Sequence, residues 1–227
     1  MEKRTRAVES EVIGLTASDR ERMTELYHGR LDVLGEDVRT VGWSSRSDQH
    51  LRFEVLCRGL DLRGKRILDI GCGLGDFIPW AEQKFGADFD YVGLDLSTRL
   101  VAAARQRFGG PRRQFIEGTL ASGTPNGDFD ISVLSGTLTF KTSDNISTMR
   151  SVLLGAWERS REAVCSNFMT SYADTMLEKN YHYRPEEILT FAKTLSRFVT
   201  LHHDYDLWEF TIQVFRQPTL ARGTAHQ

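Results

Sequence analysis

The sequence RILDIGCGLGDF, residues 66–77, decides how this chain folds, because an apolar run breaks there into closely spaced glycines. Ile67, Leu68 and Ile70 predict a fully buried strand. The glycines that follow let the backbone turn tightly and approach a ligand where a Cβ atom would collide. Asp76 then opens a helix of mixed polarity. Strand, glycine turn and helix together predict a nucleotide-type site.

The spacing of the glycines indicates which kind of nucleotide binds. They fall as G-x-G-x-G, whereas the dinucleotide fingerprint G-x-G-x-x-G seats a pyrophosphate on the helix N-terminus. Asp76 would repel a pyrophosphate at that position, so the spacing favours a ligand without phosphates. A second strand, residues 91–97, follows, and Asp95 stands at its carboxyl end. Such sites place their ribose-binding acid there, roughly 20 residues after the glycines.

Residues 68–75 and 93–97 resemble the first and second motifs of the class I S-adenosylmethionine-dependent methyltransferases. A looser resemblance extends from Trp43 to Arg216. Over this range the chain is similar to a bacterial branch of the family whose substrates are unassigned. The resemblance implies S-adenosylmethionine as cofactor and S-adenosylhomocysteine as product, with an acid at Asp69 near the cofactor's amino group and Asp95 on its ribose. The cofactor-binding residues that it implies are Asp69, Gly71, Cys72, Gly73, Gly75, Asp95, Leu96, Thr119, Leu120 and Ser135.

The adenine contact departs from the family's pattern. In the family, the turn after the third strand, residues 113–117 here, usually carries an acid that binds the adenine amine. Thr119 stands in the place of that acid, and its hydroxyl can still accept the bond, while the backbone at Leu120 can contact the ring. Glu117 is the alternative if the register is shifted.

Length and pattern predict one α/β domain, with a Rossmann-like, seven-stranded, mostly parallel sheet whose last strand is antiparallel. Only four residues separate the sixth strand, 197–203, from the seventh, 208–216, and so short a link favours a hairpin. Helices are expected on both faces. We expect residues 1–60 to form a helical cap, 61–217 the methyltransferase domain and 218–227 a flexible tail. In the cap, Ser18 is the expected N-cap of a helix ending at Gly35, and a second helix spans residues 44–60.

Composition restricts the possible partners. A net charge of −2 gives no general field that attracts polyanions, which disfavours nucleic acid and anionic membranes. Cys57, Cys72 and Cys165 are too widely spaced for metal-ligand pairs or a disulfide framework and suit a reducing cytoplasm. No segment has the apolar length of a membrane span or the apolar core of a signal peptide. A cytoplasmic monomer or homodimer is expected.

The cap and the exit of the fourth strand, residues 128–135, supply candidates for the substrate pocket. Helices ahead of the first strand commonly cover the cofactor in this family, so Trp43 and Arg46 are predicted substrate contacts. Tyr27, Gln49, His50 and Arg52 are further lid candidates, unless they pack the helices or face solvent. After the fourth strand, Ser135, Gly136, Thr137 and Phe140 suit a small-substrate pocket, and the Asn/Asp-Pro-Pro-aromatic turn of amino-methylating enzymes is absent.

Asp144 and Asn145 invite comparison with the metal site of catechol-type methyltransferases. The pair follows the wrong strand, and no partner acid stands at Ser135, so we interpret Asp144 as a helix cap and expect no metal.

An aromatic loop, residues 169–184, is the leading substrate region, because long loops inside compact domains are often functional. Its predicted substrate contacts, suited to an aromatic or anionic acceptor, are Tyr172, Tyr181, Tyr183 and Arg184. His182 is the predicted general base, and His203, at the catalytic edge of the sheet, is the second candidate. Alternatively, Tyr183 and Arg184 pin the loop onto the following helix, His182 points to water, and His203 belongs to a hydrogen-bonded corner.

The predicted activity is methyl transfer to a small-molecule acceptor, at oxygen before nitrogen. A general base is optional, because a carboxylate acceptor needs none. One alternative is an RNA or protein methyltransferase, which a basic face beside the pocket would support. That face would consist of Arg39, Arg46, Arg52, Arg58, Arg63 and Arg66. The other alternative is a non-catalytic protein that binds S-adenosylmethionine.

Overall fold

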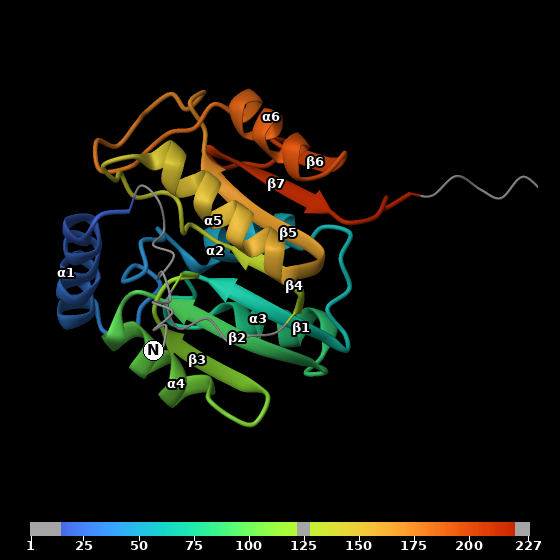
Figure 1. Cartoon of the computed structure of the whole chain (residues 1–227). Helices are drawn as coiled ribbons and strands as arrows, with labels where there is room; N and C mark the ends of the chain where they lie inside the picture. The colour runs from blue at the N-terminus through green and yellow to red at the C-terminus, as the bar shows by residue number, and fades with distance from the viewer. Residues whose placement is uncertain (1–14, 122–127, 221–227) are drawn as a thin grey trace, which may run out of the picture.

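The computed structural model describes residues 15–121 and 128–220, which fold around one sheet with the strand order β3-β2-β1-β4-β5-β7-β6 (Figure 1). The strands are β1 (Lys65–Ile70), β2 (Phe89–Asp95), β3 (Arg113–Glu117), β4 (Phe129–Leu134), β5 (Ser160–Met169), β6 (Phe198–His202) and β7 (Glu209–Phe215). β7 runs antiparallel to β5 and β6, and the other pairings are parallel. The predicted fold is confirmed, including the hairpin of the last two strands.

Six helices surround the sheet in the described part of the chain: α1 (Ala17–Leu34), α2 (Arg46–Leu56), α3 (Phe77–Phe85), α4 (Thr98–Phe108), α5 (Asn145–Arg159) and α6 (Pro185–Leu195). α2, α3 and α4 pack on one face of the sheet, and α5 and α6 pack on the other. α1, blue in Figure 1, lies beyond the end toward which the arrows of the parallel strands point. It is therefore placed to cover a site at the carboxyl ends of those strands.

Side chains of β1 alternate between the two apolar cores. Ile67 belongs to the core under α2, α3 and α4, whereas Leu68 and Ile70 belong to the core under α5 and α6. Because helices cover both faces of the sheet, apolar side chains lie on both sides of β1, as expected for a strand of a parallel sheet. β1 also pairs with β2 on one side and β4 on the other. This reversal of strand order opens a crevice at its carboxyl end, where ligands of such sheets bind.

Local hydrogen bonds correct the predicted start of α1. Thr16, not Ser18, is the N-cap, and it forms a reciprocal capping box with Asp19. The Thr16 hydroxyl accepts from the Asp19 amide, and the Thr16 amide donates to the Asp19 carboxylate. Gly35 ends the helix as predicted. The second helix is shorter than predicted, because Ser45 caps it and it ends at Leu56.

Asp144 is the N-cap of α5, as predicted, since its carboxylate accepts from the Ser147 amide. Residues 1–14 of the expected cap and 221–227 of the expected tail lie outside the described residues. Within the described ranges, no helix has the length and apolarity to cross a membrane. Those same residues contain no group of three or more His, Cys, Asp or Glu side chains that could hold a metal ion.

Candidate functional site

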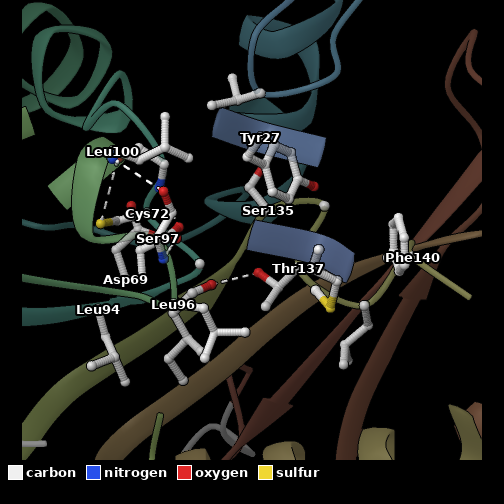
Figure 2. Close-up of a pocket in the computed structure, with 18 of the residues that line it drawn as sticks. Tyr27, Asp69, Cys72, Leu94, Leu96, Ser97, Leu100, Ser135, Thr137 and Phe140 are labelled. Carbon is white, nitrogen blue, oxygen red and sulfur yellow. Dashed lines mark hydrogen bonds between the residues drawn. The ribbon is translucent and has the colours of Figure 1, made fainter. Parts of the chain in front are cut away.

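A cavity of about 140 Å³ lies at the carboxyl ends of β1, β2 and β4, beneath α1 and the segment before α2. In Figure 2, Tyr27 reaches toward the cavity from α1, while Asp69, Cys72 and Ser97 gather on the other side of the cavity from Phe140. Of the predicted cofactor-binding residues, those that line the cavity are Asp69, Gly71, Cys72, Gly73, Asp95, Leu96, Thr119, Leu120 and Ser135.

The glycine loop is shaped by close contacts that leave no room for side chains. Gly71 and Gly73 have φ angles of +76° and +53°, in the left-handed region. A Cβ atom on Gly71 would lie 2.7 Å from Oγ1 of Thr137, and one on Gly73 would lie 2.8 Å from Cγ1 of Val41. Gly75 does not line the cavity. A Cβ atom on Gly75 would lie 3.1 Å from the rings of Phe108 and Phe115, so this glycine allows the loop to pack closely against α4 and β3.

Asp95 is held by backbone amides at the end of β2. The amide of Gly73 donates to its Oδ2 at 2.9 Å, and the amide of Ser97 donates to its Oδ1 at 2.9 Å. Burial raises the pKa of Asp95, although these bonds partly oppose the increase. Burial and the nearby charge of Asp95 also raise the pKa of Tyr27, which reaches into the cavity from α1. A fixed carboxylate in this position suits the paired hydroxyls of a ribose.

Asp69, which precedes the glycine loop near the end of β1, is 3% exposed, and the Tyr91 hydroxyl donates to its Oδ2 at 2.6 Å. Burial raises its pKa to about 7, and the charge of Asp95 contributes in the same direction. A cation placed beside Asp69 would stabilise its ionised form. The carboxylate therefore fits the ammonium group of an amino-acid tail.

The predicted adenine contacts Leu96, Thr119 and Leu120 all line the cavity. The Thr119 hydroxyl accepts from the Ala121 amide at 3.1 Å, which orders the turn after β3. Glu117, the alternative partner of the adenine amine, is exposed and does not line the cavity. The glycine loop, the carboxylates of Asp69 and Asp95, and the lining at Leu96 and Leu120 together fit S-adenosylmethionine.

The loop after β4 forms the wall of the cavity beside the glycine loop, since Thr137 lies against Gly71. The Gly136 amide donates to Oδ1 of Asn167 at 2.7 Å, and the Thr137 hydroxyl donates to the Ile70 carbonyl. Ser135 lines the cavity, and its buried hydroxyl has no hydrogen-bond partner among the described residues. An oxygen that needs a partner is thus presented to a ligand in the cavity.

The cap closes on this wall through Trp43. A Cβ atom on Gly136 would lie 2.2 Å from the Trp43 indole, so the ring lies directly against that glycine. The guanidinium of Arg52 lies 4.1 Å from the centre of the same ring and forms a buried ion pair with Glu209. Arg52 is therefore a packing residue of the cap, whereas Arg46 is exposed and does not line the cavity.

Most of the aromatic loop lies away from the cavity. Phe140, predicted from the exit of the fourth strand, lines the cavity. The predicted contacts from the loop do not line it: Tyr172, Tyr181, Tyr183 and Arg184. Tyr183 is fully buried, with its hydroxyl donating to the Leu138 carbonyl at 3.1 Å. Tyr172 is 57% exposed. Tyr183 therefore fixes the loop, as in the alternative interpretation, but it does so through the Leu138 carbonyl after β4 and not through the following helix.

Neither predicted base lines the cavity. Nδ1 of His182 lies 2.9 Å from the Thr170 carbonyl, so this ring helps to order the loop. His203 is exposed and contacts the rings of Tyr172 and Phe210. The catalytic assignments of His182 and His203 find no support in this geometry.

None of the six arginines whose clustering would support an RNA or protein methyltransferase lines the cavity. Arg39, Arg58 and Arg63 pair with Asp37, Asp204 and Asp61.

Sequence reasoning missed several residues that shape the site. Tyr91, Asn167 and Glu209 lie inside strands and support the cavity from behind. Their signal is a polar residue within an otherwise apolar strand, which indicates a buried hydrogen bond. Val41 and Met23, from the cap, contribute apolar lining.

Comparison with known proteins agrees with this geometry. Residues 67–154 match a family model described as a methyltransferase domain. The chain is 33% identical over 159 residues to "Putative methyltransferase Rv1506c" of Mycobacterium tuberculosis, covering 65% of this chain and 91% of that protein.

Solved structures of low sequence identity share the fold. Magnesium protoporphyrin IX methyltransferase from Synechocystis PCC 6803, with bound S-adenosylmethionine, superposes with a TM-score of 0.62 at 15% identity, over 87% of this chain and 95% of that one. The pyocyanin biosynthetic protein PhzM gives a TM-score of 0.59 at 19% identity, over 88% of this chain and 61% of that one.

Proposed function

Because this chain belongs to the class I S-adenosylmethionine-dependent methyltransferases, we propose that it methylates a small molecule, at oxygen rather than nitrogen. S-adenosylmethionine supplies a methyl group already activated on a sulfonium. The protein must therefore mainly hold the acceptor in line with that group, and orientation alone supplies several kcal/mol of the barrier.

The proposed cofactor contacts follow the cavity wall. Asp95 accepts hydrogen bonds from the ribose hydroxyls, and Asp69 faces the amino group. Leu96, Thr119 and Leu120 surround the adenine. The narrow backbone of the glycine loop lets the cofactor lie against β1, where side chains on Gly71 or Gly73 would collide with their neighbours.

The enclosure of the cavity is the observation that carries the small-molecule assignment. Tyr27 and Val41 of the cap line it from above, and Trp43 rests against Gly136 across it. A small molecule suits a pocket that the cap partly covers and that is lined by apolar side chains together with a limited set of polar groups. The structural neighbour PhzM, named for pyocyanin biosynthesis, is compatible with such an acceptor.

Among the residues that the structure describes, no side-chain base without a partner lines the cavity, which favours an acceptor oxygen that is already anionic. Among the described lining residues, the carboxylates are Asp69, Asp76 and Asp95, and each has a partner: Tyr91, Arg107 and backbone amides respectively. A carboxylate or an acidic phenol requires no base to attack the methyl group. The Ser135 hydroxyl is the proposed donor that positions this oxygen.

A groove beside the cavity provides positive charge for such an acceptor. It shares Phe140 and Thr142 with the cavity, and its charged lining residues are Arg22, Lys141, Lys179 and the acid Glu178. Neither lysine forms an ion pair within the described part of the chain. Exposed cations raise the local concentration of anionic ligands and accelerate their entry.

The test is methyl transfer from radiolabelled cofactor to a panel of aromatic carboxylates, phenols, amines and an RNA. Transfer to carboxylates or phenols supports the proposal, and alkali distinguishes them because methyl esters hydrolyse whereas methyl ethers persist. Asp95→Ala should abolish transfer, while Asp90→Ala, an exposed aspartate on the same strand, should not. Transfer confined to amines or RNA would contradict the proposal, and cofactor binding without any transfer would favour a non-catalytic protein.

A further inference from the structure

Gln49 of α2 is a buried side chain with an unused hydrogen-bonding atom at the cavity. It is 3% exposed and lines the cavity together with Asp69 and Asp76. Its Nε2 lies 3.4 Å from Oδ2 of Asp76, while its Oε1 has no partner among the described residues. Because an ionised carboxylate only accepts hydrogen bonds, the amide nitrogen must face Asp76. The oxygen is then the atom left without a donor.

Asp76 cannot rotate to give Gln49 a different hydrogen bond, because Arg107 holds its other carboxylate oxygen. Arg107 donates from Nη2 to Oδ1 of Asp76 at 2.9 Å and from Nη1 to the Leu74 carbonyl at 2.9 Å. The charge of Asp76 is thereby paired, and its position at the end of the glycine loop is set. Gln49 is consequently held against the cavity by a rigid partner.

An unsatisfied buried acceptor costs on the order of 1–3 kcal/mol, so a ligand that donates to it gains that energy back. The polar side chains that line the cavity include the carboxylates of Asp69 and Asp76 and, with its amide against Asp76, the free oxygen of Gln49. A cluster of acceptors fits a cationic group with several N–H donors.

We propose that Gln49 accepts a hydrogen bond from the ammonium group of the cofactor's amino-acid tail. The helix α2 thus takes part in recognising the tail. The inference rests on the cofactor of the family and is independent of the acceptor proposed above.

Calorimetric binding of two ligands tests this. S-adenosylhomocysteine carries the tail, whereas 5′-methylthioadenosine has the same adenosine and a thioether without it. Gln49→Met should weaken S-adenosylhomocysteine binding by about tenfold or more, the loss of one charge-assisted hydrogen bond, and leave methylthioadenosine binding unchanged. Gln49→Glu, which keeps an oxygen acceptor, should bind S-adenosylhomocysteine more tightly than Gln49→Met. Gln83→Met, an exposed glutamine of α3, is the control and should change neither affinity.

Thermal melting without ligand separates recognition from a structural role. Removing an unsatisfied amide should leave the melting temperature of Gln49→Met at or above that of the wild type. Equal losses for both ligands, or no loss for S-adenosylhomocysteine, would overturn the inference. Wild type that binds neither ligand would also overturn it, together with the cofactor site. A wild type that binds both but methylates only amines would refute the proposed acceptor and leave this inference standing.

Discussion

Asp69 shows how burial tunes one residue of the site. Its carboxylate lies against the Tyr91 hydroxyl in the floor of the cavity, and burial raises its pKa to about 7. The pKa of Tyr91 is also raised well above its usual value, so the phenol stays protonated and can donate at any neutral pH. The charge of Asp69, and with it the attraction for a cationic tail, therefore changes near physiological pH.

We predict that S-adenosylhomocysteine binds more tightly as the pH rises from 6 to 8, because only the ionised form of Asp69 attracts the ammonium. Below about pH 7 the affinity should fall by up to about tenfold per pH unit. Calorimetry across this range is the measurement, and Asp69→Asn should flatten the profile. A wild-type profile as flat as that of the variant would contradict the prediction.

The same shift has an effect on stability. The folded pKa of Asp69 lies above its ordinary value of 3.8, so the folded protein holds this proton more tightly than the unfolded chain. The free energy of unfolding of the ligand-free protein should therefore fall, relative to Asp69→Asn, as the pH rises from about 4 to about 7. Urea titrations of both proteins at several pH values measure the difference, which should widen with pH and then level off.

Gly136 is a second residue whose identity is dictated by its surroundings. It has a φ of +72°, and a Cβ atom would collide with Trp43. Gly136→Ala should cost about 1–2 kcal/mol for the left-handed backbone, with about 1–3 kcal/mol more for overpacking. It should also displace Trp43, which tryptophan fluorescence would report. Gly64→Ala is the matched control, because its φ is +69° and nothing lies within 4 Å. Equal losses of unfolding free energy in the two variants would show that Trp43 moves aside without cost.

At the scale of elements, α2 is attached to the sheet by a buried polar chain. Arg52 donates from Nε to Glu209 of β7 at 2.8 Å, and Glu209 accepts from Nδ2 of Asn167 of β5 at 2.8 Å. Asn167 in turn receives the Gly136 amide, on the wall of the cavity. One chain of hydrogen bonds therefore links the cap helix, two strands and the exit of β4.

Removing Arg52 alone should lower the free energy of unfolding more than removing the charges of both Arg52 and Glu209. Arg52→Met leaves Glu209 buried without its cation and should destabilise the protein by about 3–5 kcal/mol. The double variant Arg52→Met with Glu209→Gln should recover much of this loss in urea unfolding. Arg58→Met, in an exposed pair with Asp204, should have little effect. Additive losses in the double variant would show that the two residues act independently.

At the scale of the whole molecule, the sheet and its two cores form a rigid platform, and α1 is the element least bound to it. Asp19 is its one buried residue in the described structure. Its attachments include the carboxylate of Asp19, which accepts from the Ser143 amide at 3.2 Å, and the pairing of Asp32 with Arg99 of α4. Regions with few buried contacts open most readily. The cap helix is therefore suited to admit ligands.

Hydrogen exchange should show this difference directly. In the ligand-free protein, amides of α1 should exchange faster than those of β1, which is buried on both faces. S-adenosylhomocysteine should slow exchange in α1, because Tyr27 closes over the cavity that the ligand fills. Protection of β1 should hardly change. Exchange in α1 that is slow from the start, or insensitive to the ligand, would contradict a moving cap.

The sequence by itself determined the core of the site and the order of the elements around it. A strand, three glycines and an acid about 20 residues later encode their own backbone path, because left-handed turns need glycine at Gly71 and Gly73. The short link before β7, six residues between His202 and Glu209, likewise allows little besides a hairpin. These features depend on neighbours in the chain, so a local pattern is enough to predict them.

Only the tertiary structure decided which polar and aromatic side chains face the cavity. His182 and Tyr183 looked like site residues because their chemistry suits a substrate, yet the Thr170 and Leu138 carbonyls engage them elsewhere. Conversely, Gln49 gained its free oxygen from the placement of Asp76, 27 residues away in the chain. A buried polar group takes whichever partner folding brings near, since leaving it unpaired is costly. That choice involves distant segments, and spacing in the sequence does not encode it.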